Sequence, residues 1–152
     1  MYNNHEILES VISKGAEVEI KDKDGRTPLH YAAEFNSTEC VKILIDNKCD
    51  VNCVDVDDLT PLHLAAMRNC AGSAQLLLEK GAKVNAVNKY QNTPLHFAAK
   101  HNRVEVSKIL LKNGADPKLK AQDGLTPAQY AELNGHFETY QVISETKTCR
   151  IA

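Results

Sequence analysis

The sequence of 152 residues lacks tryptophan and has only eight other aromatic side chains, five tyrosines and three phenylalanines. Its core must therefore be built from leucine, isoleucine, valine and alanine. No apolar run reaches the roughly 20 residues of a membrane helix, and residues 1–25 lack the basic start and apolar stretch of a signal peptide. We therefore expect a soluble protein of the cytosol or the nucleus, with no integral membrane segment.

The sequence also lacks an excess of either charge, because 18 lysines and arginines face 20 aspartates and glutamates. This balance gives no general attraction toward nucleic acid or anionic lipid, so no nucleic-acid partner is expected. Five cysteines at irregular spacings, without a secretion signal, predict reduced thiols. The 43% hydrophobic fraction excludes a disordered chain, and the length suits one domain.

A seven-residue motif organises the chain. Thr-Pro-Leu-His-Tyr-Ala-Ala at 27–33 recurs with small changes at 60–66 and 93–99 and decays at 126–132, always 33 residues further on. Repetition in constant register is the signature of a repeat architecture. The predicted single domain, 1–152, divides into an N-terminal half repeat that acts as a cap, three full repeats and a C-terminal capping repeat: 1–21, 22–54, 55–87, 88–120 and 121–152.

Each part of the repeat has a physical interpretation. Thr27 can cap a helix whose first residue is Pro28, where the missing N–H costs nothing. A second helix follows and ends at glycines such as Gly81 and Gly114, which favour left-handed backbone. Asp24-Gly25 marks a tight turn before the next repeat. Two antiparallel helices and an extended hairpin form a unit that buries its apolar face only by stacking on neighbours.

The Thr-Pro-Leu-His-x-Ala-Ala signature on a 33-residue period resembles the ankyrin repeat family over the whole chain. The resemblance implies a mainly α fold, a solenoid of stacked helix-turn-helix units with β-hairpin loops. It also implies a concave surface, made of hairpin tips and inner helices, that binds other proteins.

Three departures from the repeat pattern are informative. Lys48 stands where other repeats have glycine, so left-handed backbone there would cost ~1 kcal/mol. In the last repeat, Gln129 and Glu132 replace the histidine and second alanine of the motif. Polar residues on a terminal face are what a capping repeat needs for solubility.

The histidines and cysteines predict structure rather than chemistry. His30, His63 and His96 share one position in successive repeats, so we interpret them as copies of a device that bonds the neighbouring hairpin backbone. Cys49 and Cys53 replace alanines of the next repeat and are read as small core fillers. A solenoid encloses no cleft for a paired acid and base. We therefore predict no catalytic, cofactor-binding or metal-binding residues.

Two positions carry weaker signals of modification. The resemblance implies that the hairpin residues Asn52 and Asn85 are candidates for asparaginyl hydroxylation, although asparagine is also an ordinary turn residue. The sequence from Cys149 to Ala152 fits a C-a-a-X prenylation box, with an arginine where an aliphatic residue is usual. Cys149 is therefore a candidate lipidation site.

Positions that vary between repeats predict the partner-binding surface. Several predicted exposed sites on the hairpin tips and inner helices carry apolar, aromatic or arginine side chains, the types enriched in interface cores. The predicted partner-binding residues are Arg26, Phe35, Leu59, Met67, Arg68, Lys89, Tyr90, Lys100, His101 and Leu133.

Charge is uneven along the repeats. Residues 88–120 hold seven basic and two acidic side chains, and every other repeat is net acidic. We therefore expect a monomeric, non-catalytic scaffold whose partner places an acidic segment near repeat 88–120. Two alternatives stay open: a targeting module of a larger channel, kinase or ubiquitin-ligase subunit, or a small standalone inhibitor or assembly chaperone.

Overall fold

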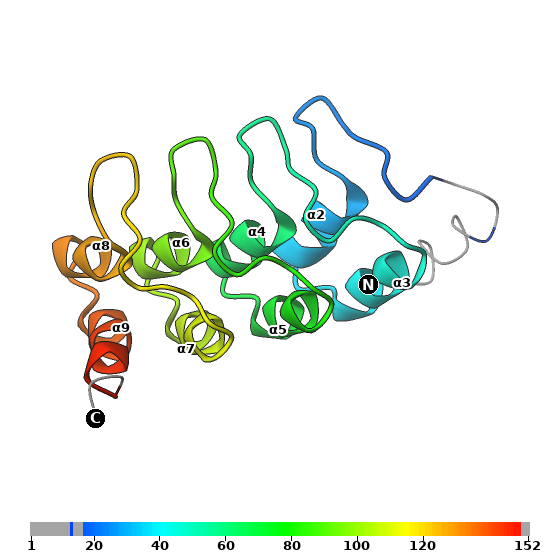
Figure 1. The fold of residues 1–152 in the computed structure, drawn as a ribbon. Coiled ribbons are helices and arrows are strands. Elements are labelled where there is room, and N and C mark those ends of the chain that lie inside the picture. The colour runs from blue at the N-terminus through cyan, green and yellow to red at the C-terminus, as the bar shows by residue number, and fades with distance from the viewer. Residues whose placement is uncertain (1–12, 14–16, 150–152) are drawn as a thin grey trace.

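A computed structural model describes residue 13 and residues 17–149, and it shows two parallel rows of helices (Figure 1). The inner row consists of α2 (Pro28–Glu34), α4 (Pro61–Met67), α6 (Pro94–Lys100) and α8 (Pro127–Leu133). The outer row consists of α3 (Thr38–Asp46), α5 (Ala71–Glu79), α7 (Val104–Lys112) and α9 (Phe137–Cys149). The predicted mainly α solenoid is confirmed.

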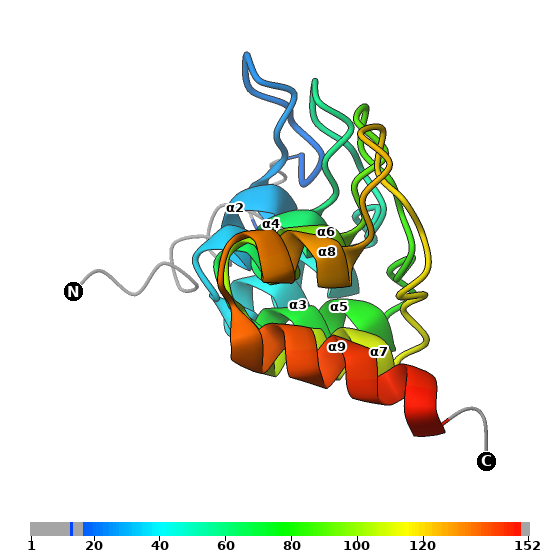
Figure 2. The same ribbon diagram turned by 90° about the vertical axis from the view of Figure 1, so that its left-hand side faces the viewer.

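The inner row lies over the outer row (Figure 2), and the buried core residues come from both rows. Each inner helix packs against the inner helix of the next repeat and against its own outer helix. Leu29, Leu62 and Leu95, one from each copy of the motif, are fully buried, as is the second alanine of each copy. Because alanine is small, the helices approach closely without large aromatic side chains.

The threonine and proline of the motif start each inner helix as predicted. In α4, the Thr60 hydroxyl accepts a hydrogen bond from the backbone N–H of His63 at 3.3 Å. In return, Nδ1 of the His63 ring accepts one from the backbone N–H of Thr60 at 3.1 Å. This reciprocal capping box occupies two amide donors that have no partner within the helix.

The long loops follow the course of hairpins and project away from the helices (Figure 1). None of them contains a β-strand within the described residues, so the expected β-hairpins lack a ladder. The backbone hydrogen bonds at the tips are too few to form a ladder. Each tip is closed by a bond of its own turn, such as Asp55 N–H to Leu59 O at 3.1 Å. A single further bond, such as Val56 N–H to Asp24 O at 3.0 Å, joins neighbouring tips.

The three residues that depart from the repeat pattern have the predicted backbone conformation or exposure. Lys48 has a φ of 66°, in the left-handed region that Gly81 and Gly114 occupy in the next repeats. Gln129 and Glu132 are exposed, although the corresponding residues of the earlier repeats are buried. The helix predicted in the half repeat 1–21 lies largely outside the described residues. The same holds for the lipidation motif 149–152, apart from the backbone of Cys149.

Candidate protein-binding surface

Three histidines connect the inner helices α2, α4 and α6 to the loop that follows each of them in the stack. The Nε2 atoms of His30, His63 and His96 lie 2.8, 2.9 and 3.0 Å from the backbone oxygens of Leu59, Asn92 and Leu125. In each ring, Nδ1 accepts from a threonine amide, so Nε2 carries the proton and donates. Burial lowers the pKa of all three imidazoles. Their predicted structural role is confirmed.

Two asparagines form a second set of links between repeats. Oδ1 of Asn52 accepts from the Lys83 amide at 2.9 Å, and Oδ1 of Asn85 accepts from the Asp116 amide at the same distance. Glu19 takes this role one repeat earlier, because its Oε1 accepts from the Asp50 amide. Both asparagine side chains are thus committed to turn geometry in the next repeat.

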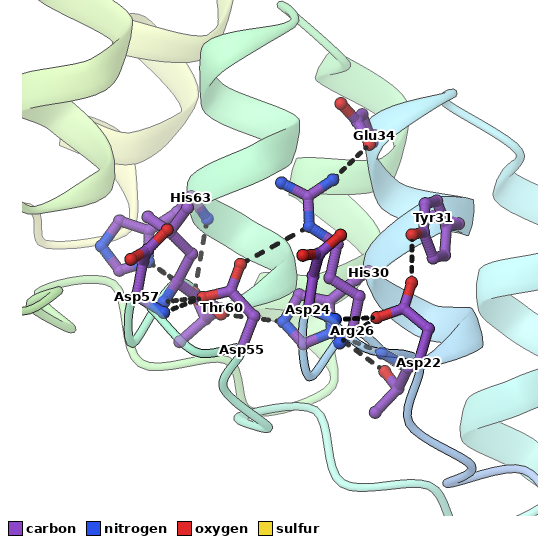
Figure 3. A network of polar contacts seen from close by, with 12 residues as sticks. Asp22, Asp24, Arg26, His30, Tyr31, Glu34, Asp55, Asp57, Thr60 and His63 are labelled. Carbon is purple, nitrogen blue, oxygen red and sulfur yellow. Dashed lines mark hydrogen bonds and ion pairs between the residues drawn. The ribbon is translucent and has the colours of Figure 1, made fainter.

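An ion network joins repeats 22–54 and 55–87 beside the inner helices (Figure 3). The Glu34 side chain is only 8% exposed, and its two oxygens lie 3.3 Å from Arg26 and 3.3 Å from Arg68. Arg26 also lies 3.5 Å from the buried carboxylate of Asp55. Two predicted partner-binding arginines therefore serve the chain's own packing as well, and their buried partner Glu34 was not among the predicted site residues.

The loop tips hold the next two predicted residues. Lys89 forms an ion pair with Asp57 of the preceding tip, and hydrogen bonding to that carboxylate raises the pKa of the ammonium. The same ammonium lies 5.1 Å from the centre of the Tyr90 ring, which is 52% exposed. Lys89 is thus paired with an acid of the chain at the surface, and the Tyr90 ring is half exposed.

The remaining predicted apolar residues differ in exposure. Phe35 and Leu133 are 70% and 72% exposed, at the ends of α2 and α8. Met67 is half-buried at the end of α4. Leu59 is also half-buried, because it lies in the loop whose backbone accepts the His30 bond. The two exposed side chains are therefore the stronger candidates for contact with a partner.

Basic side chains converge at the end of α6. His101 is half-buried there, and its pKa is lowered by burial and by Arg103, Lys100, His136 and Arg68. Arg103 reaches from the start of α7 to α4, where its Nε donates to the Met67 oxygen at 2.9 Å. Arg103 and His136 were not among the predicted site residues. Their convergence depends on the stacking of three repeats.

Two models of known protein families match the chain. Residues 1–88 match a profile described as ankyrin repeats (3 copies), and residues 76–131 match one described as ankyrin repeats (many copies). The chain belongs to the ankyrin repeat family. Ankyrin repeats are generally protein–protein interaction modules and are typically non-catalytic. A search of curated proteins found no match for the chain.

Three further features of the ankyrin repeat chain concern metal binding, its cysteine thiols and membrane-spanning helices. Among residues 13 and 17–149, no group of three or more His, Cys, Asp and Glu side chains is placed to hold a metal ion. Cys40, Cys49 and Cys70 are buried free thiols, and burial raises the pKa of Cys49 to about 12. No helix in these ranges has the length and apolar character needed to cross a membrane.

Proposed function

We propose that this ankyrin repeat chain is a non-catalytic scaffold that binds another protein through its concave face. That face would consist of the loop tips and the exposed ends of the inner helices. One observation carries the proposal: Phe35, Tyr90 and Leu133 expose large apolar surface at positions where the repeats differ. The repeated motif positions are buried and explain the fold, whereas exposed aromatic side chains at variable positions are the type enriched in interface cores.

Charge supports a partner with an acidic segment near repeat 88–120. This repeat holds seven basic and two acidic side chains. Lys100 is exposed and has no ion pair within residues 17–149, so its charge is free to attract a carboxylate. We further propose that the chain acts as a monomer in the cytosol or the nucleus, where its free cysteines would stay reduced.

Site-specific photo-crosslinking tests the proposed face. A crosslinking amino acid replaces Tyr90 on a loop tip, or Lys42, which is exposed on the outer helix α3. In cell extract, the chain labelled at Tyr90 should form a discrete adduct with one protein, and the chain labelled at Lys42 should not. Equal adducts from both positions, or adducts only from Lys42, would reject the concave face.

A further inference from the structure

The ends of the inner helices form one row along the stack. Phe35, Arg68 and His101 are the residues that close α2, α4 and α6, and they are spaced by one repeat. Leu133 is the last residue of α8, one repeat after Lys100 at the end of α6, and Phe137 starts α9 four residues later. Because the repeats stack in register, these positions follow one another from the first full repeat to the last. We call the set the helix-end strip: Phe35, Arg68, Lys100, His101, Leu133 and Phe137.

The helix-end strip has a cationic middle and apolar ends. Phe35 lies at one end, and Leu133 and Phe137 lie at the other, with Phe137 79% exposed. Between them lie Arg68 and Lys100, and both are exposed. Arg103, at the start of α7, adds to the positive potential there and is one of the charges that lower the pKa of His101. A ligand that matches this pattern carries carboxylates in its centre and large apolar side chains at both ends.

The loop tips offer a poorer match to an acidic ligand. Lys89 is already paired with Asp57, and Arg26 with Glu34 and Asp55. A ligand carboxylate would therefore compete with an acid of the chain at each of these cations. Arg68 shares Glu34 with Arg26, but Lys100 has no acidic partner in the described part of the chain. Lys100 is therefore the cation of the strip that a ligand carboxylate can approach without displacing an acid of the described chain.

The length of the strip sets the length of the ligand. Packed helices lie 8–10 Å apart, so three steps from the first to the last inner helix span roughly 30 Å. An extended chain advances about 3.3 Å per residue and needs about nine residues to cover that distance.

We propose that the helix-end strip binds an extended acidic segment of a partner protein, about nine residues long, with a large apolar side chain at each end. The proposal rests on the proposed protein-binding function and narrows it to one surface and one ligand chemistry. The carboxylates pair with Lys100 and Arg68, and the apolar ends cover Phe35 and the Leu133–Phe137 pair.

Selection from a random peptide library tests the ligand chemistry. The probe is a phage-displayed library of peptides of about twelve residues, long enough to span the strip. Selection on the whole chain should enrich Asp and Glu in the centre, with large apolar residues near both ends. Enrichment of basic or uncharged peptides, or no enrichment at all, would overturn the proposal.

Matched variants then locate the site. Lys100→Glu should weaken binding of the best enriched peptide about tenfold at low salt, and Lys112→Glu, on the exposed end of α7, should change it little. Phe35→Ser should likewise weaken binding about tenfold. Val56→Ser is its control, because Val56 is similarly exposed but lies on a loop tip. Circular dichroism checks that each variant is folded.

The outcomes separate this proposal from the proposed function. If Val56→Ser abolishes binding and Phe35→Ser and Lys100→Glu do not, the ligand lies on the loop tips and the strip proposal is wrong. Crosslinking from Tyr90 would still support the concave face in that case. If the strip variants bind every enriched peptide as well as the unchanged chain does, the strip is not the site.

Discussion

Acidification should weaken the stack through its buried histidines, most clearly through His63. This side chain is only 1% exposed, and burial lowers its pKa from 6.5 to about 4. A proton on Nδ1 would remove the acceptor for the Thr60 amide. Because the folded pKa lies below the unfolded one, the unfolded chain binds the proton first. The stabilising contribution is complete above pH 6.5 and is lost as the pH falls toward 4.

The size of the effect follows from the two pKa values. At about pH 5 the unfolded imidazole is almost fully protonated and the folded one is almost fully neutral. The difference lowers the free energy of unfolding by ~2 kcal/mol relative to pH 7.5. His30 and His96 add losses of the same sign, because burial lowers their pKa as well.

Urea unfolding followed by circular dichroism at both pH values measures this loss, and His63→Gln isolates one imidazole. Glutamine is a suitable replacement because Gln129 already accepts the Thr126 amide at 2.9 Å in the last repeat. The variant is expected to be less stable at neutral pH but to lose ~2 kcal/mol less on acidification. An equal loss in both proteins would refute the assignment of acid sensitivity to His63.

Three further changes test the backbone and the ion network. Gly25→Ala and Gly124→Ala both strain left-handed backbone, which costs ~1 kcal/mol, but only the first brings a Cβ to 3.0 Å from the next loop. Urea unfolding should therefore show the larger loss for Gly25→Ala, and equal losses would contradict the loop packing. Lys48→Gly should raise the free energy of unfolding by about 0.5–1 kcal/mol, and a lower value would show that its backbone is unstrained. Glu34→Gln should lower the thermal midpoint and make it less sensitive to salt, since two ion pairs lose their charge; an unchanged salt dependence would argue against the network.

The repeat pattern made most of the fold predictable. Thr27-Pro28 marks a helix start by local chemistry alone. Because the motif recurs every 33 residues, the same argument predicts the start of all four inner helices. The shared position of the histidines also predicted their bonds to the neighbouring loop, because side chains one period apart meet equivalent surroundings. Local chemistry and period therefore account for the caps, the turns and the order of the helices.

Pairing between charged side chains was not predicted, because it depends on contacts across the stack. Glu34 pairs with Arg68, which is 34 residues further on, and Asp57 pairs with Lys89, which is 32 residues further on. Both separations differ from the 33-residue period by one. Residues so spaced lie on neighbouring repeats with a small offset, where long side chains reach each other. A search for opposite charges at this spacing would have found both pairs.

The hydrogen bonds from His30, His63 and His96 cross from one repeat to the next. The pKa of each imidazole therefore depends on whether its interface with the next repeat, here called a joint, is closed. In the folded stack, burial lowers the pKa of each ring, and each Nε2 lies at hydrogen-bond distance from the following loop. When a joint opens, the imidazole meets water and its pKa returns toward the value of free histidine. Titration of the three rings by NMR would therefore reveal which joint separates first, without any added label.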